Sequence, residues 1–167
     1  MPAVIENIAL EIVRRLERIT VLNGYSFDAV RVVRADRLSV DWSPEDSLII
    51  VKQGDSTINQ DSSHPGNPPA IAFDTEFEIE CFVRSSEHSD PVSYNSVQTE
   101  RGAQIIEAIT TEATDPGQWY TFAGNAVLSS IGDVRNFGVS DGNHNGVTVV
   151  INVMHRQSEN NPYQVRA

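Results

Sequence analysis

Apolar and polar residues alternate strictly along Ala70–Arg84, and this is the clearest pattern in the chain. Its odd positions include the apolar residues Ile71, Phe73, Phe77, Ile79, Cys81 and Val83, while its even positions carry four carboxylates, Asp74, Glu76, Glu78 and Glu80. Such alternation is typical of a strand with one face in a core and one face in water. It therefore predicts a strand whose exposed face holds a row of carboxylates spaced about 6.6 Å apart.

Two segments show helical spacing instead. In Ile5–Ile19 the apolar residues recur three and four positions apart, and charged residues fill the other side. This predicts a helix with a single buried stripe. A weaker repeat predicts a second helix from about Ser96 to Ala113, which ends before Asp115-Pro116-Gly117.

The remaining apolar segments are short and rich in β-branched residues, which favours strands. We expect them at Tyr25–Arg34, Leu38–Trp42, Leu48–Lys52, Ala126–Ile131, Val134–Val139 and Val147–Met154. Ser140–Gly146 has the composition of a turn before the last of them. Because turns join neighbouring strands, the fold class is expected to be α+β, a mostly antiparallel sheet with the two main helices packed on one face.

Two polar segments interrupt this pattern. Gln53–Pro69 is dominated by Ser, Asn, Asp, Gly and Pro and predicts a long loop, either a surface insertion or a segment that orders against a neighbouring subunit. His155–Ala167 predicts an extended polar tail. We otherwise expect a single domain over residues 1–167, since this length suffices for one core.

Composition narrows the function. The formal net charge of −11 argues against binding to nucleic acid through phosphates or to anionic membranes. No apolar run is long enough for a transmembrane helix, and the N-terminus lacks the pattern of a secretory signal, so synthesis and initial location in a cytoplasm are expected. The only cysteine, Cys81, falls on the apolar side of its strand and predicts a buried small side chain.

The acidic row Asp74, Glu76, Glu78 and Glu80 has several interpretations. Catalytic carboxylate pairs normally come from different elements and meet in a cleft, which four carboxylates on one strand do not resemble. Carboxylate oxygens also suit a divalent cation. The row is otherwise a solvated strand face, or a surface that repels an anion or docks a basic partner.

No motif elsewhere indicates chemistry, so we predict no enzyme, no cofactor and no metal. Asp141–Gly146 resembles the start of a calcium loop, but its twelfth position is Asn152 rather than Glu, and a hairpin turn explains it better. The four histidines lack metal-ligand spacing, and no phosphate loop, dinucleotide fingerprint or nucleophile elbow is present.

Three pieces of the sequence carry a family resemblance. They are Trp119…Phe122-Ala123-Gly124-Asn125-Ala126…Ile131-Gly132-Asp133, then Asp141-Gly142…Gly146, then His155-Arg156…Asn161-Pro162-Tyr163. In this order they resemble the tail terminator, or tail completion, proteins of tailed bacteriophages. That family often has Asp-Gly-Asn where this chain has Ala123-Gly124-Asn125, and an aromatic residue where it has His155.

The resemblance implies a structural virion protein without chemistry or cofactor. Such proteins form a homo-oligomeric, hexameric ring that caps the tail tube at its head-proximal end and joins the neck, so the expected partners are the chain itself, the tail tube protein and a neck or head-completion protein. If Asp74, Glu76, Glu78 and Glu80 line the ring's channel, they repel transiting DNA. The alternatives are a head–tail connector, neck or other minor tail protein, and an unrelated small enzyme or metal-binding module.

A ring contact between copies is heterologous and needs edges that order on docking. The long loop, the aromatic cluster and the tail supply the expected contact residues. We predict that the subunit or partner interface includes Ile58, His64, Trp119, Tyr120, Pro162 and Tyr163.

Overall fold

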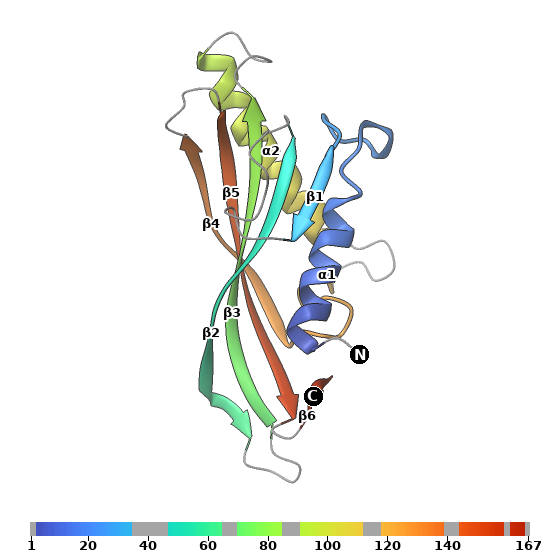
Figure 1. Cartoon of the computed structure of the whole chain (residues 1–167), viewed down its shortest axis with the longest axis vertical. Coiled ribbons are helices and arrows are strands. Elements are labelled where there is room, and N and C mark those ends of the chain that lie inside the picture. The colour runs from blue at the N-terminus through green and yellow to red at the C-terminus, as the bar shows by residue number, and fades with distance from the viewer. Residues whose placement is uncertain are drawn as a thin grey trace.

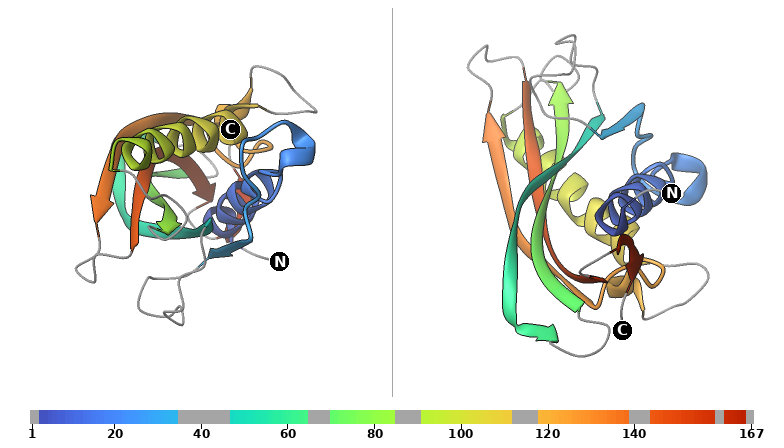
Figure 2. Two further views of the ribbon diagram at one scale, coloured as in Figure 1. Left: turned by 90° about the horizontal axis from the view of Figure 1, so that it is seen from above. Right: turned by 60° about the horizontal axis from the view of Figure 1, so that its bottom comes forward.

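The computed structural model describes residues 3–34, 47–64, 70–84, 91–111, 118–138, 144–158 and 161–165. These residues form one twisted sheet with two long helices on one of its faces (Figures 1 and 2). Helices α1 (Val4–Leu16) and α2 (Pro91–Thr110) form the second layer, and two short 3₁₀ turns, η1 (Val21–Asn23) and η4 (Trp119–Thr121), extend it. The predicted α+β class is confirmed.

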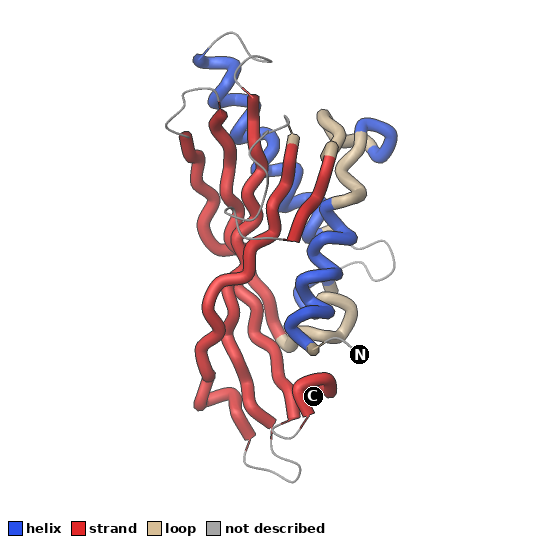
Figure 3. The backbone as a smooth tube through the Cα atoms, in the orientation of Figure 1, coloured by secondary structure: helices blue, strands red, loops and turns tan. Residues whose placement is uncertain are grey.

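The described strands form a six-stranded sheet in the order β1-β2-β3-β5-β4, with β6 paired to β5 (Figure 3). Their bounds are β1 Arg31–Arg34, β2 Leu48–His64, β3 Ala70–Arg84, β4 Leu128–Gly138, β5 His144–Ser158 and β6 Asn161–Val165. Among the strands formed by the described residues, only β1 and β2 pair in parallel. The predicted strand Ala70–Arg84 is β3, and it lies between two long neighbours, β2 and β5.

The sheet narrows to a waist where its strands cross in projection (Figure 1). One cross-strand row joins Gln53, Phe77, Ile151 and Ile131, and a β-bulge begins at each end of it, on β2 after Gln53 and on β4 after Ile131. Bulges bend a strand and increase its twist. Two bulges that start at one level therefore account for the strong twist there.

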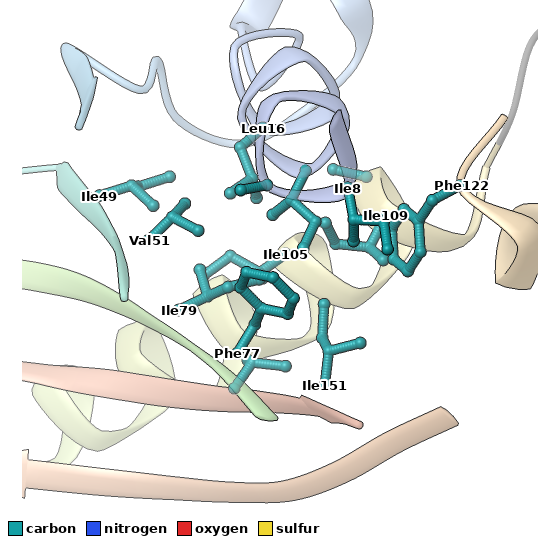
Figure 4. Close-up of a cluster of buried hydrophobic side chains, with 14 of the residues drawn as sticks. Ile8, Leu16, Ile49, Val51, Phe77, Ile79, Ile105, Ile109, Phe122 and Ile151 are labelled. Carbon is teal, nitrogen blue, oxygen red and sulfur yellow. The ribbon is translucent and has the colours of Figure 1, made fainter. Parts of the chain in front are cut away.

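The main core lies between the helices and the sheet (Figure 4). Helix α1 contributes the stripe that its spacing predicts, and β3 contributes its odd positions. The fully buried members include Ile8, Ile12, Leu16, Phe77, Ile79, Cys81, Ile105, Ile109 and Ile151. A smaller cluster of Leu48, Ile50 and Phe82 lies on the opposite face of the sheet.

Helix and strand boundaries differ from prediction at several places. Helix α1 ends at Leu16, although Ile19 is still buried. Helix α2 begins five residues before the expected Ser96, at Pro91, since proline suits the first turn of a helix. Strand β1 covers only the last four residues of the predicted Tyr25–Arg34, and the predicted strand Leu38–Trp42 lies outside the described residues.

The predicted long loop is wrong up to residue 64, because β2 continues to His64 and pairs with β3 at Gln53, at Ser56–Asn59 and at His64. Apart from Ile58, this part of β2 is polar on both faces, so it shows no alternation. Side-chain hydrogen bonds between β2 and β3 support the pairing here: the Ser56 and Thr75 hydroxyls lie 2.6 Å apart, and Asn59 Nδ2 donates to Asp74 at 2.9 Å. Strand preference depends on the neighbouring strand more than on the residue alone.

The predicted polar tail is wrong in a similar way. His155–Ser158 extend β5, and Asn161–Val165 form β6 against it. The two apolar pieces predicted around Gly132-Asp133 are a single bulged strand, β4. Of the predicted turn Ser140–Gly146, residues 140–143 lie outside the described residues and the rest belongs to β5.

Candidate functional site

The four carboxylates of β3 lie on the sheet face opposite the helices, because the odd positions of the strand enter the main core. They are not equally accessible. Asp74 and Glu76 are exposed, Glu78 is partly buried, and Glu80 is only 8% exposed. The expected continuous row on a wet face is therefore wrong at its upper end.

Glu78 is neutralised by cations from the neighbouring strands. Lys52 Nζ of β2 lies 3.5 Å from Glu78 Oε2, and Arg135 of β4 donates to Glu78 Oε1 at 2.9 Å. The Lys52 contact follows from the β2–β3 register, which places the two residues directly opposite. Sequence reasoning missed both cations, since it considered the residues of β3 alone.

The two exposed carboxylates border a hollow of about 570 Å³ on the same face. Asp55, in the β2 bulge, adds a third carboxylate, and Asp74 accepts a hydrogen bond from Asn59. The remaining lining is hydroxyl, amide and apolar, from Thr57, Thr75, Leu128, Ser129, Ser130, Asn152, Val153 and Met154. No Lys, Arg or His lines it, so its chemistry suits a positively charged group.

The described residues hold no cluster of three His, Cys, Asp or Glu side chains able to bind a metal ion. None of the helices they form is both long and apolar enough to cross a membrane.

The predicted interface residues fall into three places. Ile58 is 60% exposed on β2. His64 ends β2, and Pro162 and Tyr163 lie in β6, but their side chains are outside the described residues. Trp119 and Tyr120 form η4, where both rings are partly buried and their centroids are 6.4 Å apart.

Trp119 packs against the main core, and its ring also meets Phe122 edge-on at 6.4 Å. Arg15 of α1 contacts both η4 and Phe122. Its fully buried guanidinium donates to the Trp119 carbonyl at 3.0 Å and to the Ile109 carbonyl at 2.7 Å, and it lies 4.8 Å from the Phe122 ring centroid. Sequence reasoning placed Arg15 on the solvent side of the helix and missed this role.

His155 was also missed as a buried group, because it was assigned to a polar tail. It lies 3% exposed on β5, and its ring stacks on Phe73 of β3 with centroids 5.5 Å apart. Burial lowers the pKa of His155, although the nearby Asp74 carboxylate opposes this effect. Residues directly opposite on adjacent strands share a face, so the β3–β5 register explains the stack.

A second surface lies in the helix layer, at the loop that joins α1 to β1. Its tip is η1, where Leu22 is 98% exposed and Val21 is 56% exposed. Val30, just before β1, is 61% exposed. The sequence pattern predicted only the strand Tyr25–Arg34 in this segment.

Comparisons with known proteins add no identity: no family model matches the chain, and no curated protein sequence matches it.

Proposed function

We propose that this chain is a structural protein that works by assembling with copies of itself. The role follows its resemblance to tail terminator proteins: a hexameric ring that caps the tail tube at its head-proximal end, joins the neck and belongs to the virion. The observation that carries the proposal is the open sheet face with its acidic hollow. Both helices pack on the other face, and the side chains of Asp74 and Glu76 at the hollow are exposed, so this part of the face is accessible for contacts between molecules.

Of the two electrostatic roles considered for the carboxylates, docking of a basic surface fits the geometry better. A surface that repels DNA needs unpaired carboxylates along the whole strand. Lys52 and Arg135 neutralise Glu78, however, and Glu80 is buried. The unpaired carboxylates that remain gather at one hollow, Asp55, Asp74 and Glu76. Grouped charge in a concave surface favours a complementary partner.

The test combines the purified chain with tail tube protein of the same virus and follows assembly by light scattering and electron microscopy. We expect rings at one end of each tube. The variant with Asp55→Asn, Asp74→Asn and Glu76→Gln should assemble poorly, whereas the matched control Glu78→Gln should still form rings. The proposal is wrong if the wild-type chain neither forms rings nor binds tube ends.

A channel-lining role for the acidic face is the competing proposal, and the exposure of Asp74 and Glu76 favours it. A density map of the assembled ring separates the two. Carboxylates that face the central channel support repulsion of DNA, and carboxylates covered by a neighbouring molecule support docking.

A further inference from the structure

The loop between α1 and β1 presents an apolar tip that is held in one conformation. Thr20 accepts a hydrogen bond from Asn23 N, Val21 N donates to the Asp28 carboxylate at 2.8 Å, and Ala29 N donates to the Ile19 carbonyl at 2.8 Å. Gly24 closes the turn with φ of 94°, a left-handed conformation that glycine adopts without strain.

The loop is also tied to the second helix, since Ser26 N donates to Gln104 Oε1 at 3.0 Å. A preformed loop loses little conformational freedom on docking. The loop therefore presents three exposed apolar side chains in a fixed backbone, as binding anchors are presented. They are Val21, Leu22 and Val30.

Charge indicates what this loop binds. Arg18 and Arg31 stand at its two ends, and neither has a carboxylate partner among the described residues, whereas Arg14 pairs with Glu11 and Arg34 with Glu6. Residues 1–37 hold six of the twelve Lys and Arg but only five of the 23 Asp and Glu, a net charge of +1. The rest of the chain carries −12. Besides its apolar tip, the loop thus presents two arginines together with Glu17 and with Asp28, whose carboxylate accepts the Val21 N hydrogen bond.

The hollow has the complementary character. It combines three carboxylates, Asp55, Asp74 and Glu76, with the apolar side chains of Leu128 and Met154. Asp55 and Glu76 have no cationic partner within the described part of the chain. The loop belongs to the helix layer and the hollow to the opposite sheet face, so the loop and hollow of one molecule cannot meet each other.

We propose that the η1 loop of one copy docks on the acidic hollow of a second copy, with Leu22 as the apolar anchor and Arg18 and Arg31 facing the carboxylates. This inference rests on the proposed self-assembly and names its contact. Because the two surfaces differ, the contact is heterologous, and repeating it generates a closed ring or an open filament.

Paired cysteines test the contact directly. Cys81 is buried, so new surface thiols are the reactive ones. Under mild oxidation the full-length Leu22→Cys/Leu128→Cys variant should give a ladder of multimers on a non-reducing gel, and each single variant at most dimers. The control Leu10→Cys/Leu128→Cys uses an aliphatic residue of α1 that is 49% exposed. Absence of multimers beyond the dimer, or an equal ladder from the control, would overturn the proposal.

Charge exchange gives a second test. Arg31→Glu and Glu76→Arg should each weaken self-association about tenfold, as loss of one significant interface contact does, and the double variant should recover most of it. Sedimentation measures the association. If the wild-type chain assembles but Leu22→Asp and both charge variants assemble equally well, this contact is wrong and the proposed function stands. If the wild-type chain does not assemble with itself or with tail tubes, both are wrong.

Discussion

Replacement of Arg15 by methionine should destabilise the fold far more than the same change at Arg14, one position earlier. Both guanidinium groups contact Glu11, at 2.9 Å from Arg15 and 2.6 Å from Arg14. Burial would raise the pKa of Glu11, but the hydrogen bonds and charges of the two arginines outweigh burial and lower it. The two sites differ in depth, since the Arg15 side chain is fully buried and that of Arg14 is half exposed.

The magnitude follows from the contacts of Arg15. Its hydrogen bonds to the Ile109 and Trp119 carbonyls involve a charged donor, each worth about 1.5 to 3 kcal/mol, and its position over Phe122 adds about 1 kcal/mol. Methionine removes these contacts but also removes the desolvation cost of a buried charge, which is a few kcal/mol. We expect a net loss of about 3 kcal/mol for Arg15→Met.

Arg14→Met is the matched control, because it removes an exposed ion pair on the same helix. Such pairs contribute about 0.5 kcal/mol. Urea unfolding followed by circular dichroism measures both free energies of unfolding. If the two variants differ by less than about 0.5 kcal/mol, the buried cation does not join α1 to α2 and η4, and the reasoning is refuted.

Three further changes test other contacts. Gly146→Ala should lower the free energy of unfolding by about 3 kcal/mol, because a Cβ there would overlap the Cys81 carbonyl and the Phe137 ring. Gly132→Ala is the control: its Cβ would first meet the movable end of a side-chain amide, so the free energy of unfolding should fall less. Urea unfolding midpoints compare the two variants. Because burial lowers the pKa of His155, the folded state disfavours its protonated form, so stability should fall as pH drops below about 6.5 and should have lost up to about 1.4 kcal/mol by pH 5.5. His155→Phe should remove that part of the pH dependence, and an unchanged pH profile would contradict the assignment. Glu78→Gln should lower the free energy of unfolding by about 0.5 to 1 kcal/mol, because it removes two ion pairs. Glu76→Gln, the control, should leave the free energy of unfolding nearly unchanged. Equal effects of the two variants in thermal melts would show that Lys52 and Arg135 do not make these contacts.

Much of the fold could be predicted from periodicity. The buried stripe of α1 and the alternation along β3 are strong because one side of each element lies in the core and the other does not. The lower half of β2 could not be found this way, since its residues are polar apart from the exposed Ile58 and their pairing depends on β3. Strand β6 likewise forms only against β5.

The candidate site was predictable only in part. Alternation placed Asp74 and Glu76 correctly on an exposed face, but it carried no information on cross-strand neighbours. Lys52 and Arg135 reach Glu78 from β2 and β4, and that contact requires knowledge of the strand order. The exposure of Leu22, six residues after the buried Leu16, is a tertiary property too, since it depends on how the η1 loop packs against the rest of the fold.

The position of β3 has a consequence for biosynthesis. Each of its pairs with β5 joins residues between 60 and 88 positions apart, because Arg84 meets His144 and Ala70 meets Ser158. As the polypeptide leaves the ribosome, the β2–β3 hairpin can close early, but the other side of β3 stays unsatisfied until residue 158 has emerged. Pairings between distant segments form slowly, and an uncovered strand can join a wrong neighbour in the meantime. Emergence of β5 is therefore the step that commits this sheet to its native arrangement.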